Sequence, residues 1–342
     1  MKNESTIMRM ELLDMIYERI ISNPDSVNGK GLLEGKMGII LFLYKYSQVR
    51  ESAKAKEEAD IIVDELWTSL NLFDAPFSFF TGHPGIAWGL FELVQKGFLE
   101  IDNELNSYLE SVDFSLFKEQ KTKTPVIIDI ESSMFTTGIY YLSRSLNVAG
   151  NYYWQENAIY LIEDCERILH KTTSYNNTFL PDLSPRLLNS ILYFLIKVHR
   201  QKIYPSKTHL LIKHAHCQIV ELIKLANIQD IIVSRYLLSE LIKSFDIYDN
   251  IDLKVIKNSM QVISAKPEEI PEILSELGFY SLLYDNISIF EAGYNVYQDS
   301  QQFFNILITN HLNREELSLK VLLGIGFGLL TISEEYGKEK KN

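Results

Sequence analysis

Six residues of this 342-residue chain have side chains that could take part in acid–base chemistry or bind a charged ligand, and each lies just before or within the start of an apolar segment. They are Glu34, His83, Asp129, Glu131, Asp182 and Arg186. Histidine exchanges a proton near neutral pH, and two carboxylates can serve as general acid and base. An arginine beside an aspartate can bind the charged groups of a peptide. These six residues are therefore our candidates for a binding site.

Three of the candidates stand at predicted helix starts, where a structural role is also open. His83, in a Gly-His-Pro sequence, could act as a general base, contact a ligand or hydrogen-bond to the backbone. Asp182 and Arg186 could anchor a peptide or form an ion pair. Asp182 or Ser184 could cap the helix that Pro185 begins.

The other candidates are carboxylates in predicted loops. Asp129 and Glu131 could do acid–base work or form an exposed charge pair. Glu34 precedes the first predicted apolar helix and could line a binding site or be an exposed loop charge. The segment Tyr284–Tyr297 is rich in aromatic and polar residues. It could bind a ligand or pack against a neighbouring hairpin.

Metal binding and cofactors are not expected. The chain has two cysteines, Cys165 and Cys217. Cys165 falls on the apolar stripe of a helix, where a thiol is buried and inert. Cys217 and His214 share a helix face at i, i+3 spacing, but two ligands do not complete a tetrahedral zinc site. We expect a solvated helix surface there.

The elements that must position these residues are helices. Apolar residues recur at spacings of three and four along most of the chain, as at Met8, Leu12, Ile16 and Ile20, which is typical of amphipathic helices. Strand-like alternation is rare, and only Pro125–Ile130 resembles a short extended piece. The pattern predicts an almost all-α chain.

A G-x-x-G-I pattern followed by an apolar helix repeats along the chain at a period of roughly 50 residues. Its anchor positions are Gly38, Gly85, Gly138, Ser190, Gly278 and Gly324. The gap from Ser190 to Gly278 leaves room for one more copy, at Tyr236–Phe245. The repeat predicts seven hairpins, each an amphipathic helix followed by a more apolar one. The apolar helices are predicted to start near Gly35, Gly82, Thr136, Pro185, Ile232, Ser275 and Leu319.

The two kinds of helix predict a closed ring over residues 1–342, as one domain. A helix that is apolar all round must be buried on all sides, so seven such helices form an inner barrel that the amphipathic helices cover. An open solenoid is the alternative, but neither terminus has the sequence of a polar cap. In a ring, the starts of the inner helices converge on one mouth. Their N-termini would favour an anion or a thiolate there.

The charge balance limits the kinds of partner. Lys and Arg number 33 against 45 Asp and Glu, for a net charge of −12. Such a chain is a poor binder of nucleic acid or of an anionic membrane surface. No apolar run approaches the roughly 20 residues of a membrane span, and the first residues do not read as a signal peptide. With no disulfide framework either, we expect a protein of the reducing cytoplasm.

Two stretches resemble the repeat motifs of the LanC-like, or lanthionine synthetase C-like, family. They are Gly31-Leu-Leu-Glu-Gly35-Lys-Met-Gly38-Ile39 and Phe80-Thr-Gly82-His-Pro-Gly85-Ile86-Ala-Trp88-Gly89. Ser78–Val94 followed by Lys96-Gly97-Phe98 is similar to the second repeat of bacterial members. The resemblance is sharp over roughly the first 145 residues. It implies an α/α toroid of seven inner and seven outer helices.

The resemblance also implies zinc chemistry. In the family's bacterial enzymes, two cysteines and a histidine hold zinc, and the zinc lowers the pKa of a cysteine thiol of a precursor peptide. The thiolate adds to dehydroalanine or dehydrobutyrine and closes a thioether ring. One family cysteine precedes the sixth inner helix and a Cys-His-Gly motif precedes the seventh. At those places this chain has Ile273–Gly278 and Glu316–Gly324, which contain no cysteine or histidine. The family's catalytic His and Asp are not recognisable either.

We therefore expect a LanC-like protein without the zinc site. It would bind a precursor peptide or a modifying enzyme in ribosomal-peptide (lanthipeptide-type) modification. Two enzymatic alternatives stay open on the same toroid. One is a metal-independent thioether cyclase, and the other is a carbohydrate-active enzyme with two carboxylates roughly 5–10 Å apart. A purely structural interaction module is a third possibility.

Overall fold

The computed structural model describes most of the N-terminal half of the chain and selected helices of the rest. The described residues are 2–22, 27, 29–33, 35–70, 78–122, 138–144, 153–173, 184–222, 232–233, 237, 270–284, 289 and 318–339. Their regular secondary structure is helical apart from an isolated bridge between Gly29 and Gly35. The predicted all-α class is confirmed. Pro125–Ile130 lies outside the described residues.

Ten helices can be delimited among the described residues, and they include amphipathic helices and more apolar ones, as predicted. They are α1 (Lys2–Ile21), α2 (Lys36–Arg50), α3 (Ala53–Ser69), α4 (His83–Gln95), α5 (Asn103–Thr122), α7 (Tyr153–Thr173), α8 (Pro185–Arg200), α9 (Pro205–Leu222), α12 (Ile270–Tyr284) and α15 (Leu319–Glu339). A further helical segment occupies residues 138–144.

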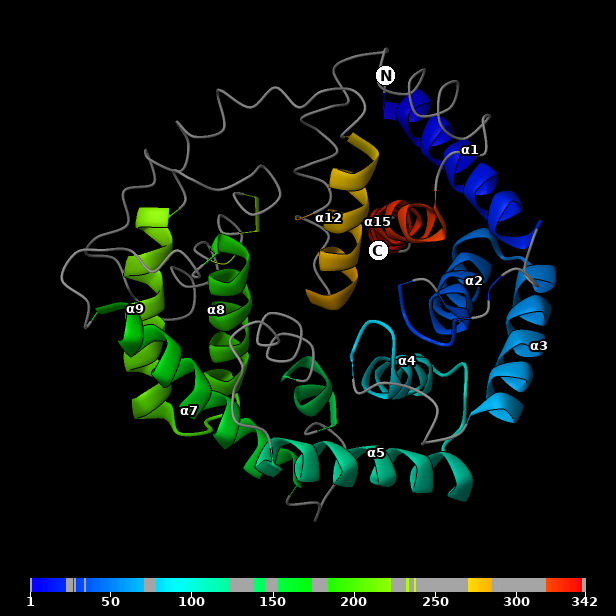
Figure 1. Ribbon diagram of the computed structural model, residues 1–342. Coiled ribbons are helices and arrows are strands. Elements are labelled where there is room, and N and C mark those ends of the chain that lie inside the picture. Colours follow the sequence, from blue (N-terminus) through cyan, green and yellow to red (C-terminus); the bar gives the residue numbers. More distant parts are fainter. Residues whose placement is uncertain are drawn as a thin grey trace.

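These helices form two concentric layers (Figure 1). The helices α2, α4, α8, α12 and α15 lie inside, and α1, α3, α5, α7 and α9 lie around them. Burial follows the same division. Every residue of α2 from Met37 to Tyr44 is buried, whereas α3 buries only Ala55, Ala59 and Leu66. The apolar and the amphipathic helices of the sequence therefore correspond to the inner and the outer layer.

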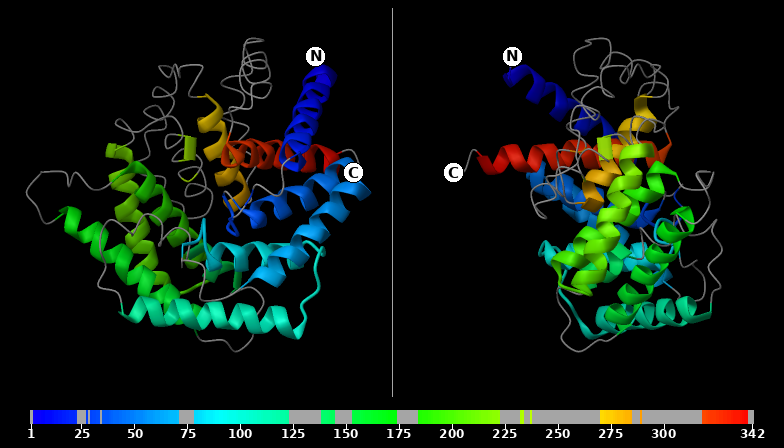
Figure 2. Two further views of the ribbon diagram at one scale, coloured as in Figure 1. Left: turned by 45° about the vertical axis from the view of Figure 1, so that its right-hand side comes forward. Right: turned by 90° about the vertical axis from the view of Figure 1, so that its left-hand side faces the viewer.

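The two ends of the chain meet, which supports a closed ring over an open solenoid. The C-terminal helix α15 packs against α12 and also against α2 and α1. Gly326 on α15 lies against Phe42 of α2 and Ile16 of α1, and the Ser333 hydroxyl is 3.6 Å from Sδ of Met10. Figure 1 and Figure 2 show α15 running roughly along the axis of the ring, with its C-terminal end beyond the other described helices.

The predicted starts of the inner helices are close to the observed ones. Helix α8 begins at Pro185 and α15 at Leu319, as predicted, and α2 and α4 begin one residue after the predicted Gly35 and Gly82. Helix α12 begins at Ile270, before the predicted Ser275. The count of seven hairpins and their union in one domain stay predictions, because parts of the third, fifth, sixth and seventh hairpins lie outside the described residues.

No helix within the described ranges combines the length and the apolar character that a membrane crossing requires.

Candidate functional site

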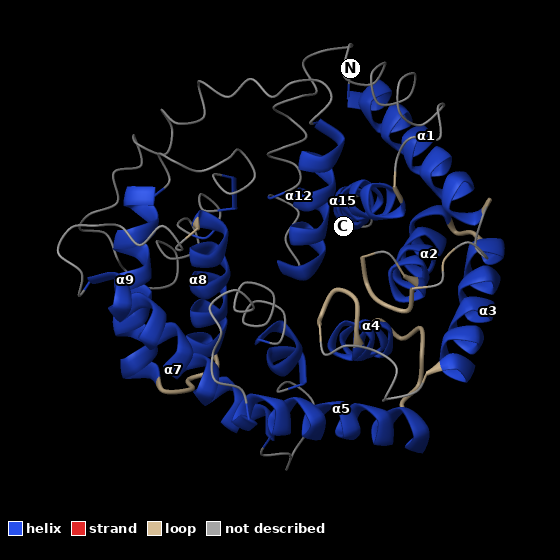
Figure 3. Cartoon of the chain, viewed as in Figure 1, coloured by secondary structure: helices blue, strands red, loops and turns tan. Residues whose placement is uncertain are grey.

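The glycine motifs bring the loops before α2 and α4 together at one end of the ring, seen in tan in Figure 3. The backbone N–H groups of Leu32 and Leu33 donate to the carbonyl oxygen of Phe80, at 2.8 and 3.2 Å. Gly31 lies so close to Thr81 that an added β-carbon would be 2.5 Å from its Cα. The two loops therefore pack backbone to backbone.

The second glycine of each G-x-x-G motif has the same local role in both repeats. A β-carbon at Gly38 would overlap the carbonyl oxygen of Leu32, and one at Gly85 would overlap that of Phe79. In each case the carbonyl belongs to the loop residue six positions earlier, which folds over the first turn of the inner helix. The repeated glycine thus reflects a repeated close approach of the backbone.

The start of α2 is not an open anion site. The N–H groups of Lys36, Met37 and Gly38 donate to the carbonyls of Gly29, Lys30 and Gly31, at 2.9, 3.3 and 3.3 Å. The loop that precedes α2 therefore folds back and satisfies the backbone donors of its first turn.

Side chains cap two other inner helices. Ser184 accepts a hydrogen bond from the N–H of Leu187 at 3.1 Å and Pro185 takes the first position of α8, as predicted. Ser318 accepts from the N–H of Val321 at 3.4 Å, before the first turns of α15. Serine capping is the usual means of satisfying these donors.

His83 is the one candidate whose side-chain surroundings are described. It is fully buried at the start of α4, with Nδ1 3.0 Å from the hydroxyl of Tyr108 on α5. Burial raises the pKa of Tyr108 well above its usual range. The Tyr108 ring packs edge-on against Trp67 of α3, with centroids 5.8 Å apart. His83 thus joins an inner helix to the outer layer, and a ligand-contacting role for it stays a prediction.

The other candidates cannot be placed. Glu34, Asp129, Glu131 and Asp182 lie outside the described residues. Arg186 is in the first turn of α8, but the position of its side chain is not described. Of the aromatic segment Tyr284–Tyr297, only the end of α12 and Ile289 are described.

The donor set does not fit the zinc site that the family resemblance implies. The described residues of α12 and α15 contain no cysteine or histidine. Where these helices meet, the Ser275 hydroxyl donates to the carbonyl of Lys320 at 3.2 Å, and Gly278 lies against the backbone of Gly324. These groups offer no thiolate or imidazole to zinc.

The cysteines cannot compensate for that loss. Cys165 is fully buried on α7, and burial raises the pKa of its thiol well above the usual range. Cys217 is exposed on the outer helix α9. Within the described ranges, no three or more His, Cys, Asp or Glu side chains are grouped so that they could hold a metal ion.

A buried ionic cluster that the sequence analysis did not predict joins α5 to the helical segment at residues 138–144. Asp113 on α5 and Arg144 are each 2% exposed, and Arg144 donates to Oδ2 of Asp113 from Nη2 at 2.9 Å and from Nε at 3.2 Å. Tyr140 donates to Oδ1 at 2.6 Å. The guanidinium carbon of Arg144 also lies 5.8 Å from the ring centroid of Phe91 on α4. The available signal was an arginine two residues after the apolar run Ile139–Leu142.

Comparison with known proteins gives one family. The model of lanthionine synthetase C-like proteins matches residues 26–184, which include the loops before α2 and α4 and the Asp113–Arg144 cluster. Searches of curated proteins and of solved structures found no match.

Proposed function

Since residues 26–184 belong to the LanC-like family, we propose that this chain binds a precursor peptide, or the enzyme that modifies it, in ribosomal-peptide modification of the lanthipeptide type. It would do so as a single toroid of seven hairpins over residues 1–342, in the cytoplasm, and without zinc. The fold and the matched segment support a place in this peptide chemistry, whereas a fold alone does not fix an activity.

The proposal rests on the kinds of residue that lie where α12 and α15 contact each other. The family's chemistry requires a zinc-held thiolate next to the sixth and seventh inner helices. In this chain the two helices approach through Ser275, Gly278 and Gly324. A binding role needs no metal ligands, so it agrees with these residues better than thioether cyclisation does.

A synthetic peptide that carries one cysteine and one dehydroalanine tests the proposal. Fluorescence anisotropy measures binding, and mass spectrometry after N-ethylmaleimide treatment detects ring closure, because a closed ring has no thiol to alkylate. We expect saturable binding and an alkylatable thiol, with or without added zinc. Ring closure, together with stoichiometric zinc that survives dialysis, would overturn the proposal.

Variants at the fourth inner helix test the predicted peptide anchor. Asp182→Ala and Arg186→Ala should each weaken binding of this peptide about tenfold if the pair binds charged groups of the peptide. Lys213→Ala, at an exposed position of the outer helix α9, is the matched control. Equal affinity in all three variants would exclude this pair as the anchor.

A further inference from the structure

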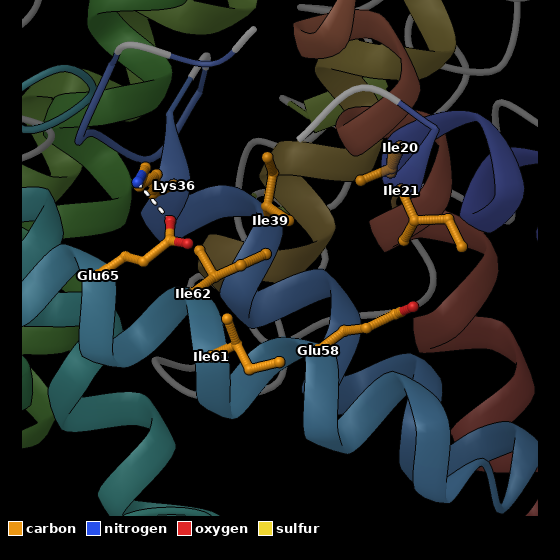
Figure 4. A pocket seen from close by; sticks show the side chains of 8 residues that line it. All are labelled: Ile20, Ile21, Lys36, Ile39, Glu58, Ile61, Ile62 and Glu65. Atoms are coloured by element: carbon orange, nitrogen blue, oxygen red, sulfur yellow. Dashed lines mark hydrogen bonds and ion pairs between the residues drawn. The ribbon is translucent and has the colours of Figure 1, made fainter. Parts of the chain in front are cut away.

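An apolar pocket lies between α1, α2 and α3, and none of the residues that line it is one of the six candidates (Figure 4). Its volume is about 200 Å³, and its walls are five isoleucines with three charged side chains. The isoleucines are Ile20 and Ile21 of α1, Ile39 of α2, and Ile61 and Ile62 of α3. Ile61 is 54% exposed, although its neighbours in the wall are largely covered.

The charged side chains of the pocket carry an excess of negative charge. Glu58 and Glu65 of α3 and Lys36 of α2 line it. Lys36 is 2.6 Å from Glu65, as drawn in Figure 4. Glu58 accepts a hydrogen bond of 2.8 Å from the Tyr17 hydroxyl, and Nζ of Lys54 lies 3.7 Å from Oε1 of Glu58.

The acidic character continues along the helix that forms the outer wall. From Glu57 to Glu65, α3 carries five carboxylates and no Lys or Arg. The carboxylates are Glu57, Glu58, Asp60, Asp64 and Glu65. Apolar walls beside an acidic helix complement a segment that carries a large apolar side chain next to cations.

The size and charge of the pocket exclude other kinds of ligand. Pockets that enclose a cofactor or a drug-sized molecule hold about 300–1,000 Å³, so this one suits one or two side chains of a docking segment. The acidic helix disfavours nucleic acid and an anionic membrane. A second copy of the chain would bring the same acidic face and the same net charge of −12.

We propose that this isoleucine pocket is the docking site for a cationic amphipathic helix of a partner protein, which inserts a large aliphatic side chain between α1 and α3 and places Lys or Arg beside Glu58 and Glu65. The inserted side chain supplies most of the affinity, since desolvated apolar anchors dominate such contacts. The cations set the association rate and its salt dependence. The inference does not depend on the peptide-binding role proposed for the ring.

A fluorescein-labelled synthetic helix with leucine at i, i+3, i+4 and i+7 and lysine elsewhere is the probe. Its counterpart has glutamate in place of lysine. Fluorescence anisotropy with the full chain should show saturable binding of the Lys/Leu helix, and raised salt should weaken it. The Glu/Leu helix should bind at least about tenfold more weakly. Equal binding of the two helices would overturn the proposal.

Ile61→Glu separates a docking pocket from general charge attraction. The substitution removes an apolar wall and adds a negative charge. The pocket therefore predicts weaker binding of the Lys/Leu helix, by about tenfold or more, whereas attraction by charge alone predicts tighter binding. Leu210→Glu adds the same charge on α9, where Leu210 is 67% exposed, and should leave the affinity within about twofold of wild type. Binding by Ile61→Glu as tight as by Leu210→Glu would refute the proposal.

Two further measurements test whether Ile61→Glu disturbs the fold and whether the pocket binds a second copy of the chain. Ile61→Ser replaces Ile61→Glu if the latter shows a lower melting temperature, and the same loss of affinity is expected. Sedimentation velocity of wild type should show no dimer that Ile61→Glu abolishes. Such a dimer would assign the pocket to a second copy of the chain and overturn the proposed partner.

Discussion

The hydroxyl of Tyr44 on the inner helix α2 donates a hydrogen bond of 2.5 Å to Oδ1 of Asp60 on the outer helix α3. Similar bonds recur between other helices of the two layers. The pairs are Tyr46 with Asp14, at 2.8 Å, and Tyr140 with Asp113, at 2.6 Å. Burial and the neighbouring carboxylate raise the pKa of Tyr46 to about 12. These tyrosines therefore stay protonated donors that link the layers of the ring.

Tyr44→Phe should lower the free energy of unfolding by about 0.5–1.5 kcal/mol, because it removes the hydrogen bond to the carboxylate of Asp60, which is exposed and can bind water instead. Urea denaturation measures the change. Tyr160→Phe is the control, since Tyr160 is 37% exposed on α7, and it should change stability by less than about 0.5 kcal/mol. Equal stability of Tyr44→Phe and wild type would show that this link between the layers does not stabilise the ring.

These links could not be read from the sequence. Tyr44 and Asp60 lie on different helices, so their contact depends on how each helix is rotated about its axis, which a spacing pattern does not determine. The partner of Arg144 could have been anticipated from the sequence. An arginine close to the apolar run that begins at Ile139 is expected to be buried, and a buried arginine needs a charged partner.

The glycine repeat was predictable because its cause is local. Gly38 and Gly85 each accommodate a carbonyl six residues earlier, so sequence periodicity and backbone contact coincide. The loop candidates Asp129, Glu131 and Asp182 lack such regularity, and no pattern in the sequence determines where they lie. Their chemistry therefore stays a prediction, while the helical layers follow from helix periodicity and the glycine motifs.

Gly85→Ala should destabilise the protein by more than about 3 kcal/mol or prevent folding, because the added methyl group overlaps the carbonyl oxygen of Phe79. Gly89→Ala is a matched control on the same helix. The atoms nearest to its added methyl group are side-chain atoms of Met37, which can shift more easily than a backbone carbonyl, so alanine should cost clearly less there. Thermal unfolding followed by circular dichroism compares the two, and equal effects would contradict the role assigned to the loop carbonyl.

Asp113→Ala should destabilise the protein by about 3–5 kcal/mol, because it leaves the buried guanidinium of Arg144 without its carboxylate partner. The double variant Asp113→Ala with Arg144→Met removes both charges and should recover part of that loss. Chemical denaturation of the wild type, the single variants and the double variant completes a thermodynamic cycle. Additive losses would show that the two side chains do not stabilise each other.

Acidification should weaken the part of the ring formed by α7, α8 and α9. Burial lowers the pKa of His216 from 6.5, and it also lowers the pKa of His199 and His214, each of which has a second histidine nearby as a smaller cause. A lowered pKa in the folded state means that, below pH 6.5, the unfolded chain binds a proton that the folded chain does not. Stability is therefore full above pH 6.5 and falls as the pH drops below it.

His216→Gln isolates one contribution to this acid sensitivity. His216 is 5% exposed on α9, and glutamine cannot take up the proton. The free energy of unfolding in urea, measured at pH 7.5, 6.5 and 5.5, should fall less steeply for the variant than for the wild type. His170→Gln replaces an exposed histidine on α7 and should leave the slope closer to that of the wild type. If His216→Gln and the wild type lose stability in parallel, the buried imidazole of His216 is not the source of the acid sensitivity.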